Sequence, residues 1–358
     1  MAERKLASIR RIANIQPIEG ADAIVVATID GWKVVVKKGE FKVGDLAVYL
    51  EIDSWVPHAF APFLSKGSEP REYGGVRGER LRTVKLRGQV SQGLLLKLET
   101  VPEKGISNAV PFIEDGRIRH QVVNGDEGED VTELLNIQKW EAPIPAQLAG
   151  QVRGMFPTGL IPKTDQERIQ NCFPEVQAKD EATYEVTMKL DGTSCTIFRW
   201  EDELRVCSRN LELKINDENR DNTLVAMALK IGDSIPDRFA FQGELMGPGI
   251  QSNREGFSEH KFFVFDIFDI QKHEYLKPFD RRKLVSDIKF DSEDIPLFHV
   301  PVKEKGIKAP ISVEEGLALA EGPSINHKVR EGLVWKCNED PSFSFKTISN
   351  AFLLKGGD

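Results

Sequence analysis

Residues 184–194, Tyr-Glu-Val-Thr-Met-Lys-Leu-Asp-Gly-Thr-Ser, constrain the fold of this chain more than any other stretch. Apolar residues occupy the even positions from 184 to 190, whereas Lys189 and Asp191 occupy odd positions. In an extended strand the even positions share one face, and the two charged side chains lie roughly 6–7 Å apart on the other face. Asp191-Gly192 is a turn signal, so the pattern predicts a β-hairpin with Lys189 near the end of its first strand.

Lys-x-Asp-Gly is too short a pattern to assign a function by itself, because such common residues recur at this spacing by chance. A solvated surface pair and a reactive pair both remain open on this segment alone. The 358 residues are 40% hydrophobic and 29% charged, which is typical of about two globular domains. Their net charge of -8 requires that any polyanionic partner be bound by a local basic patch.

The N-terminal residues are charged without an apolar core, and no apolar run approaches the length of a membrane span. The four cysteines show no Cys-x-x-Cys spacing, and the six histidines include no His-Glu-x-x-His. Disulfide and zinc frameworks are therefore not predicted. We expect a cytoplasmic protein with buried free thiols and no membrane partner.

The first 57 residues contain short apolar runs separated by turn signals. The runs cover residues 24–29, 32–36 and 44–50, and Asp30-Gly31 and Lys38-Gly39 separate them. Runs of this length, with no long helical pattern between them, predict a small antiparallel β-barrel, and we favour the OB type.

A basic segment follows the predicted barrel strands, with six Lys or Arg residues between residues 71 and 88 against two Glu residues. The strand-like part, residues 81–87, is interpreted either as a solvated edge strand or as a surface that contacts a phosphate backbone. The candidate RNA-binding residues of this segment are Arg80, Arg82, Lys85 and Arg87.

Pro143 and Pro145 break both helix and strand, which favours an interdomain linker near this point. We therefore predict an OB-like domain over residues 1–140, a linker over 141–156 and a second domain over 157–358. No internal repeat is visible in the sequence.

The second domain is predicted to combine helices with a mixed sheet. Thr164 and Glu167 have the spacing of a capping box, which predicts a helix from about Asp165 that carries Arg168 and follows Lys163. Both cations are candidate RNA contacts, although a capped surface helix is an equally simple interpretation. Further helices are predicted at 222–231, 279–288 and 313–321, and strands at 204–210, 239–246, 261–268, 332–337 and 343–348.

Alternation within these strands places charged side chains opposite the apolar ones. Glu244 lies on the face opposite Phe241, and Lys346 lies on the face opposite Phe345. Polar side chains that converge from the ends of several strands predict a polar cleft between sheets.

The order of these segments resembles the covalent nucleotidyltransferase superfamily of polynucleotide ligases and RNA capping enzymes. The matching motifs, in chain order, are Lys189-Leu190-Asp191-Gly192, Ser208-Arg209-Asn210, Phe241-Gln242-Gly243-Glu244, Phe263-Val264-Phe265-Asp266, Glu331-Gly332-Leu333-Val334 and Phe345-Lys346. Six motifs in the right order are far more specific than any one of them.

The position of the predicted barrel narrows the resemblance. Only 12 residues follow Lys346, which leaves no room for the C-terminal OB domain of capping enzymes and most DNA ligases. The chain is therefore similar to ATP-dependent RNA ligases with an N-terminal OB domain, which seal nicks in duplexes with RNA on the 3′-OH side. The predicted fold is α+β, with an OB-like β-barrel followed by a mixed-sheet nucleotidyltransferase domain.

The resemblance implies a site and a reaction. Lys189 is the nucleophile that takes AMP from ATP, and Lys346 and Asp191 assist it. Glu331, Glu244 and Asp191 are implied to hold Mg²⁺ or Mn²⁺, which as hard cations prefer oxygen ligands. The implied nucleotide-binding residues are Lys189, Arg209, Glu244, Phe265, Val334, Lys336 and Lys346.

Two roles in this implied site have a stated alternative. Phe265 is implied to stack on adenine with Val334 opposite, and plain core packing is the alternative for either residue. Many superfamily members carry Lys-x-Lys in the last motif, where this chain has Ser344-Phe345-Lys346. The orientation of the triphosphate then rests on Lys346, together with Lys336 or another basic residue.

The implied cations also address a chemical requirement. A lysine amine with a pKa of about 10.4 is mostly protonated at neutral pH, and nearby positive charge from the metal, Lys346 and Arg209 is expected to lower that pKa.

The implied partner is nicked duplex RNA or an RNA/DNA hybrid in RNA repair, with no required protein partner. Two alternatives remain, a GTP-dependent capping-type guanylyltransferase and a non-catalytic RNA-binding protein of the same fold. The first is disfavoured by the missing C-terminal barrel, and the second by the presence of the lysine and all the carboxylates.

Overall fold

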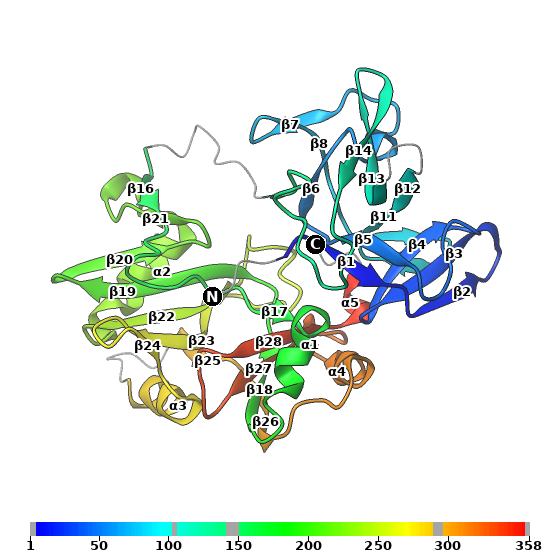
Figure 1. The fold of residues 1–358 in the computed structure, drawn as a ribbon. Helices are drawn as coiled ribbons and strands as arrows, with labels where there is room; N and C mark the ends of the chain where they lie inside the picture. The colour runs from blue at the N-terminus through cyan, green and yellow to red at the C-terminus, as the bar shows by residue number, and fades with distance from the viewer. Residues whose placement is uncertain (1–4, 102–105, 141–149, 289–295, 355–358) are drawn as a thin grey trace. The chain divides into compact units, whose positions relative to one another are not determined.

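The computed structural model describes residues 5–101, 106–140, 150–288 and 296–354. The chain divides into two compact units, Met1–Pro143 and Ile144–Asp358 (Figure 1). Each unit has hydrophobic cores of its own. All four cysteines are buried free thiols, as the sequence predicted. Among the described residues, no helix is long and apolar enough to cross a membrane.

Short antiparallel strands make up unit 1. In its described part they form the sheets β1-β5-β11, β2-β3-β4, β15-β6-β8-β7, β10-β9 and β12-β13-β14. The strands are β1 (Ala7–Arg11), β2 (Asn14–Ile18), β3 (Ala21–Ile29), β4 (Trp32–Lys37), β5 (Leu46–Leu50), β6 (Ser54–Pro57), β7 (Arg71–Tyr73), β8 (Val76–Arg80), β9 (Val84–Leu86), β10 (Gln89–Ser91), β11 (Leu94–Lys97), β12 (Glu99–Val101), β13 (Ile106–Glu114), β14 (Arg117–Val122) and β15 (Gln138–Lys139), with one 3-10 helix, η1 (Pro62–Ser65).

One turn of unit 1, at residues 30–31, forms as the sequence predicted, whereas a second turn, at residues 87–88, shortens a predicted strand. Asp30 and Gly31, with φ values of 47° and 81°, turn β3 into β4, and Ile29 pairs with Trp32. Both central residues of such a two-residue hairpin need positive φ. The strand expected over residues 81–87 is shorter, because Arg87 and Gly88 also have positive φ and turn β9 back onto β10.

Two sheets form the framework of unit 2. One contains eight strands in the order β16-β21-β20-β19-β22-β23-β24 with β25 on β23, and the other has the order β17-β28-β27-β18-β26 among the described residues. The strands are β16 (Val152–Met155), β17 (Glu167–Arg168), β18 (Tyr184–Lys189), β19 (Thr193–Trp200), β20 (Glu203–Cys207), β21 (Leu211–Leu213), β22 (Phe239–Met246), β23 (Lys261–Asp269), β24 (Glu274–Tyr275), β25 (Leu297–His299), β26 (Val302–Ile307), β27 (Gly332–Cys337) and β28 (Ser344–Ile348).

The helices of unit 2 lie at the predicted places, apart from α1, which begins later than predicted, and α5, which the sequence analysis did not predict. They are α1 (Ile169–Gln177), α2 (Thr223–Ile231), α3 (Pro278–Asp287), α4 (Val313–Ala320) and α5 (Asn350–Leu354), with the 3-10 helices η4 (Asp217–Asn219) and η5 (Gly232–Ser234). The Ser312 side chain accepts a hydrogen bond from the Glu315 N–H at 3.1 Å and so caps α4, as its capping-box spacing predicted.

The predicted hairpin at Asp191-Gly192 is wrong. β18 pairs with β26 and β27 in one sheet, whereas β19 pairs with β20 and β22 in the other, so the chain crosses between sheets at this point. Gly192 is required for close approach, since a Cβ atom there would lie 2.4 Å from the carbonyl oxygen of Leu245. The Asp-Gly pair therefore delivers the end of β18 to the opposite sheet.

The helix predicted from Asp165 is also wrong. Residues 164–166 are irregular, Glu167 and Arg168 pair in parallel with Phe345 and Lys346, and α1 begins only at Ile169. Pairing with β28 provides backbone hydrogen bonds that the local capping signal could not anticipate.

The predicted linker, residues 141–156, extends too far. The units divide between Pro143 and Ile144, and residues 141–149 lie outside the described residues. Val152 and Met155 pair with β21, so the second unit begins before the predicted residue 157. Local composition marked the prolines but contained no signal for this edge strand.

Candidate functional site

A pocket of about 270 Å³ lies between the two sheets of unit 2. Lys189 on β18 and Val334 on β27 line it from one sheet, and Glu244 on β22 and Phe265 on β23 line it from the other. Strand alternation therefore brings the polar side chains of Lys189 and Glu244 to a cleft between sheets, as the sequence predicted.

Lys189, which lines the pocket, forms an ion pair with Glu331. Lys189 is directly opposite Gly332 in the pairing of β18 with β27, so the preceding residue, Glu331, lies beside it. The lysine Nζ is 2.7 Å from Oε1 of Glu331, and the two side chains are 26% and 15% exposed. An ion pair this shielded from water is screened far less than a surface pair.

The electrostatic environment keeps Lys189 protonated. Burial lowers its pKa, but the carboxylates of Glu331 and Glu244 raise it more, so the pKa lies above the ordinary lysine value. In the protein without metal or nucleotide, the carboxylates therefore outweigh the lowering that the sequence analysis expected from the metal, Lys346 and Arg209, and these two side chains both pair with Asp165. Additional positive charge beside Glu331 and Glu244 is needed to release the amine as a nucleophile.

Glu244 and Asp191 complete the acidic side of the site. The Gly192 N–H donates to Oε1 of Glu244 at 3.1 Å, and burial raises the pKa of Glu244 to about 7. Burial, followed by the negative charge of Glu331, also raises the pKa of Asp191, although Arg254 lies 3.7 Å away. A nearby cation would therefore stabilise the charged form of both carboxyl groups.

The oxygen donors of these carboxylates suit a divalent metal ion, but the side chains are not arranged as a complete set of metal ligands. In the described part of the chain, no group of three or more His, Cys, Asp or Glu side chains is placed to hold a metal ion. Glu331, Glu244 and Asp191 nevertheless supply hard oxygen donors, and Glu331 raises the pKa of the other two. Their role as metal ligands stays a prediction.

Basic side chains gather around Asp165. Lys346 on β28 and Arg209 after β20 each lie 3.5 Å from its carboxylate. Lys163 donates to the side chain of Asn210 at 3.0 Å. The predicted phosphate-binding residues Lys346 and Arg209 therefore line one pocket from different sheets, held by an aspartate to which sequence analysis gave no role.

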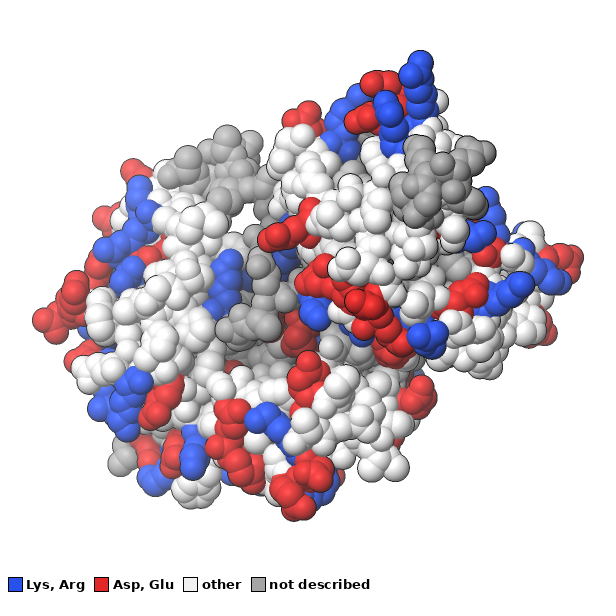
Figure 2. Space-filling view, viewed as in Figure 1, with Lys and Arg blue, Asp and Glu red and all other residues white. Residues whose placement is uncertain are grey.

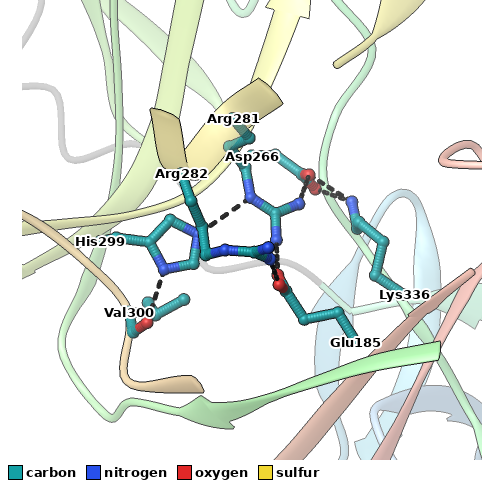
Figure 3. A network of polar contacts seen from close by, with 7 residues as sticks. All are labelled: Glu185, Asp266, Arg281, Arg282, His299, Val300 and Lys336. Carbon is teal, nitrogen blue, oxygen red and sulfur yellow. Dashed lines mark hydrogen bonds and ion pairs between the residues drawn. The ribbon is translucent and has the colours of Figure 1, made fainter. Parts of the chain in front are cut away.

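A buried charged network closes another part of the pocket (Figure 3). Lys336 contacts both carboxylate oxygens of Asp266, and Arg281 contacts Asp266 at 3.3 Å and also Glu185. Arg282 contacts Glu185 as well. The predicted triphosphate contact by Lys336 is not supported, because its ammonium group is buried against Asp266.

His299 extends this network toward the pocket wall. Arg281 Nε donates to His299 Nε2 at 3.0 Å, which leaves the imidazole proton on Nδ1 to be donated to the Val300 carbonyl at 2.7 Å. Burial, followed by the charge of Arg281, lowers the pKa of His299 to about 3. The neutral histidine thus connects Arg281 to Val300, which lines the pocket.

The loop after β22 supplies site residues that the sequence analysis missed. Gln251 lines the pocket and donates to the Gly192 carbonyl at 3.2 Å. Arg254 pairs with Asp191, and its guanidinium lies 4.5 Å from the centre of the Phe352 ring in α5. The glycines at 247, 249 and 256 have positive φ and were the available signal of a tightly folded loop here.

The predicted RNA-binding residues fall in separate places. Arg80 pairs with Asp53 at 2.5 Å and lies over Trp140, so its charge is largely neutralised. Arg82, Lys85 and Arg87 are exposed on and beside the β9–β10 hairpin. In unit 2, Arg168 is next to Lys346 in the pairing of β17 with β28. On the face shown in Figure 2, Lys and Arg atoms are interspersed with Asp and Glu atoms.

Comparison with protein families found a match in each of the two units. A family profile described as an OB-fold domain matches residues 6–98, and one described as RNA ligase matches residues 182–348. A search of curated proteins found no match.

Solved structures of Naegleria gruberi RNA ligase are similar over the whole chain. A point mutant with AMP and Mn is 42% identical over 99% of each chain, with a TM-score of 0.76. A second point mutant with ATP and Mn is 41% identical over 98% of this chain and 99% of that chain, with a TM-score of 0.76. The ligase with PPi is 41% identical over 99% of each chain, with a TM-score of 0.74.

Proposed function

Because this chain belongs to the RNA ligase family, we propose that it seals 3′-OH/5′-phosphate nicks in duplex RNA, or in duplexes that contain RNA, at the expense of ATP. The observation that carries the proposal is that Lys189 lines a pocket between the two sheets and is held there by Glu331. A role in RNA repair and a cytoplasmic location stay predictions.

The proposed reaction has three steps. The Lys189 amine attacks the α-phosphorus of ATP, a phosphorus–nitrogen bond forms and pyrophosphate leaves. The RNA 5′-phosphate then attacks this phosphorus and takes the AMP, which frees the lysine. Finally the 3′-OH attacks the 5′-phosphorus of the RNA-adenylate, and AMP leaves as the phosphodiester forms. The relatives with AMP, with ATP and with PPi support this sequence by analogy.

The residues of the chain have distinct proposed roles in these steps. Glu331 orients the Lys189 ammonium at 2.7 Å, and Lys346 and Arg209 offer positive charge to phosphates once they exchange Asp165 for substrate. Phe265 and Val334 contact the faces of the adenine ring. Glu331, Glu244 and Asp191 would hold Mg²⁺ or Mn²⁺, which supplies positive charge that lowers the lysine pKa and stabilises charge on phosphate oxygens.

Substrate preference tests the proposal directly. We expect a nick with 3′-OH and 5′-phosphate in duplex RNA to be sealed with ATP at least about 100-fold faster than single-stranded RNA of the same ends, because the duplex aligns the reacting groups. Single-turnover sealing with ATP or GTP, on all-RNA nicks and on nicks with DNA on either side, measures this preference. Equal rates on single strands, or use of GTP in place of ATP, would refute the proposed function.

The β9–β10 hairpin is the proposed duplex contact of unit 1. Replacing Arg82, Lys85 and Arg87 together by alanine is expected to weaken binding of nicked duplex RNA about tenfold at 0.1 M salt and to flatten its salt dependence, because phosphate contacts release counterions. Label transfer from ATP to Lys189 should not change. Binding is measured at several salt concentrations, with alanine replacements of the exposed Lys37, Lys38 and Lys42 as a charge-matched control. Equal losses in both triple variants would assign the effect to net charge alone.

A further inference from the structure

The two side chains proposed to clamp the adenine ring come from different sheets. Phe265 is on β23, which pairs with β22, β24 and β25, and Val334 is on β27, which pairs with β18 and β28. Among the described residues no strand pairing joins these two sheets. The backbone of Val300 and Pro301 is hydrogen-bonded to Val264 of one sheet and to Met188 of the other, so side-chain contacts near the clamp act together with this backbone link to set the distance between its two walls.

An ion pair joins the two walls immediately beside the clamp. Asp266 follows Phe265 on β23, and Lys336 is two residues beyond Val334, on the same face of β27. The Lys336 ammonium contacts both oxygens of the Asp266 carboxylate, and these side chains are only 5% and 2% exposed. All four residues line the pocket.

Arg281 fixes this ion pair to the rest of unit 2. Its guanidinium, 1% exposed, reaches from α3 to Asp266 on β23 and to Glu185 on β18 (Figure 3). Its Nε also donates to His299. Two strands, one from each sheet, are thus tied to one buried cation, so the Lys336–Asp266 pair has little freedom to move.

The place of Lys336 along its strand argues against a contact with the triphosphate. Lys336 is opposite Glu185 in the pairing of β27 with β18, whereas Gly332 is opposite Lys189. Four residues of strand separate the two positions by roughly 13 Å. The α-phosphate must lie at the Lys189 end, and Val334 lies between the two ends, so Lys336 stands at the base end of the pocket.

We propose that the ion pair between Lys336 and Asp266 sets the width of the adenine clamp formed by Phe265 and Val334. Lys336 and Asp266 are positioning residues that act through the two clamp side chains, and neither binds the β- or γ-phosphate. The inference rests on the proposed ATP-dependent function, because it assigns the clamp to the base of that nucleotide.

Replacing Lys336 by methionine tests this inference, because it should weaken ATP binding without slowing the chemical step. Without the ion pair the clamp loosens, and we expect the ATP concentration for half-maximal formation of enzyme–AMP to rise about tenfold, with the maximal rate within about threefold of wild type. Lys336→Arg keeps the charge and should recover most of the ATP affinity. Lys283→Met, which removes an exposed lysine of α3, is the matched control and should behave as wild type.

Competing ligands separate a base clamp from a phosphate contact. The inhibition constant of AMP should rise in Lys336→Met by the same factor as the ATP value, whereas that of pyrophosphate should not change. An unchanged ATP value, or a loss of pyrophosphate inhibition with AMP inhibition intact, would overturn the inference. If Lys336→Met does not fold, as its melting temperature will show, Asp266→Asn is measured against the same criteria. Wild-type protein that forms no enzyme–AMP would instead refute the proposed function itself.

Discussion

Replacement of Lys189 by alanine is expected to abolish transfer of label from α-labelled ATP to the protein and to slow ATP-dependent sealing of a 5′-phosphate nick at least about 10³-fold. The physical reason is that, among the lysines that the structure describes along this pocket, no other amine is in position. Lys189 is the lysine that reaches Glu331 at 2.7 Å, while Lys336 is buried against Asp266 and Lys346 pairs with Asp165. The measurement is covalent labelling followed by denaturing electrophoresis.

A pre-adenylated nick separates the role of the nucleophile from a loss of folding. Lys189→Ala should still seal this substrate, because the RNA already carries the AMP that the lysine would otherwise deliver. Lys272→Ala, which removes an exposed lysine, should label as wild type does. Label on Lys189→Ala comparable to wild type would assign the nucleophile to another residue and remove the basis of the proposed mechanism.

The second large effect is expected for Glu331→Ala, which should reduce enzyme–AMP formation at least about 100-fold at saturating ATP. Glu331 contacts Lys189 and raises the pKa of Glu244 and Asp191, so its loss removes the group that orients the amine and one of the three carboxylates at the predicted metal position. Labelling is measured over a range of Mn²⁺ concentrations.

Two control variants show whether the effect of Glu331→Ala comes from the charge at this position. Glu331→Gln keeps the size of the side chain without its charge and should be nearly as inactive, since an amide is a weak ligand for a divalent cation. Glu304→Ala, on the exposed part of β26, should be active. Substantial label on Glu331→Ala would contradict the predicted metal role and leave Glu331 with the structural role of its backbone carbonyl, which accepts a hydrogen bond from the Ser349 N–H just after β28.

Sequence patterns were sufficient wherever the information was local or repeated in order. The capped helix α4, the Asp30-Gly31 hairpin and most strands of unit 2 follow from spacing and turn chemistry, and they were confirmed. The order of six motifs, with the barrel first, predicted an OB-fold domain before a ligase domain, and the family profiles and solved relatives confirmed this fold and family.

Local signals failed where distant segments compete for the same backbone. Thr164 and Glu167 have the spacing of a helix cap, yet pairing of Glu167 and Arg168 with β28 takes precedence over it. Asp191-Gly192 has the composition of a hairpin turn, but β18 finds its partners in β26 and β27, about 110 and 140 residues later in the chain. Neither partner is visible in the turn itself.

The sequence by itself determined which residue types the candidate site offers, since alternation and motif order predicted Lys189, Glu244, Glu331 and Lys346 without coordinates. Only the tertiary structure decided which charges neutralise one another. In the structure Lys336 pairs with Asp266, Lys346 and Arg209 both pair with Asp165, and Lys189 pairs with Glu331. Coulomb energies depend on distance and burial, and both are set by how the two sheets face each other rather than by spacing along the chain.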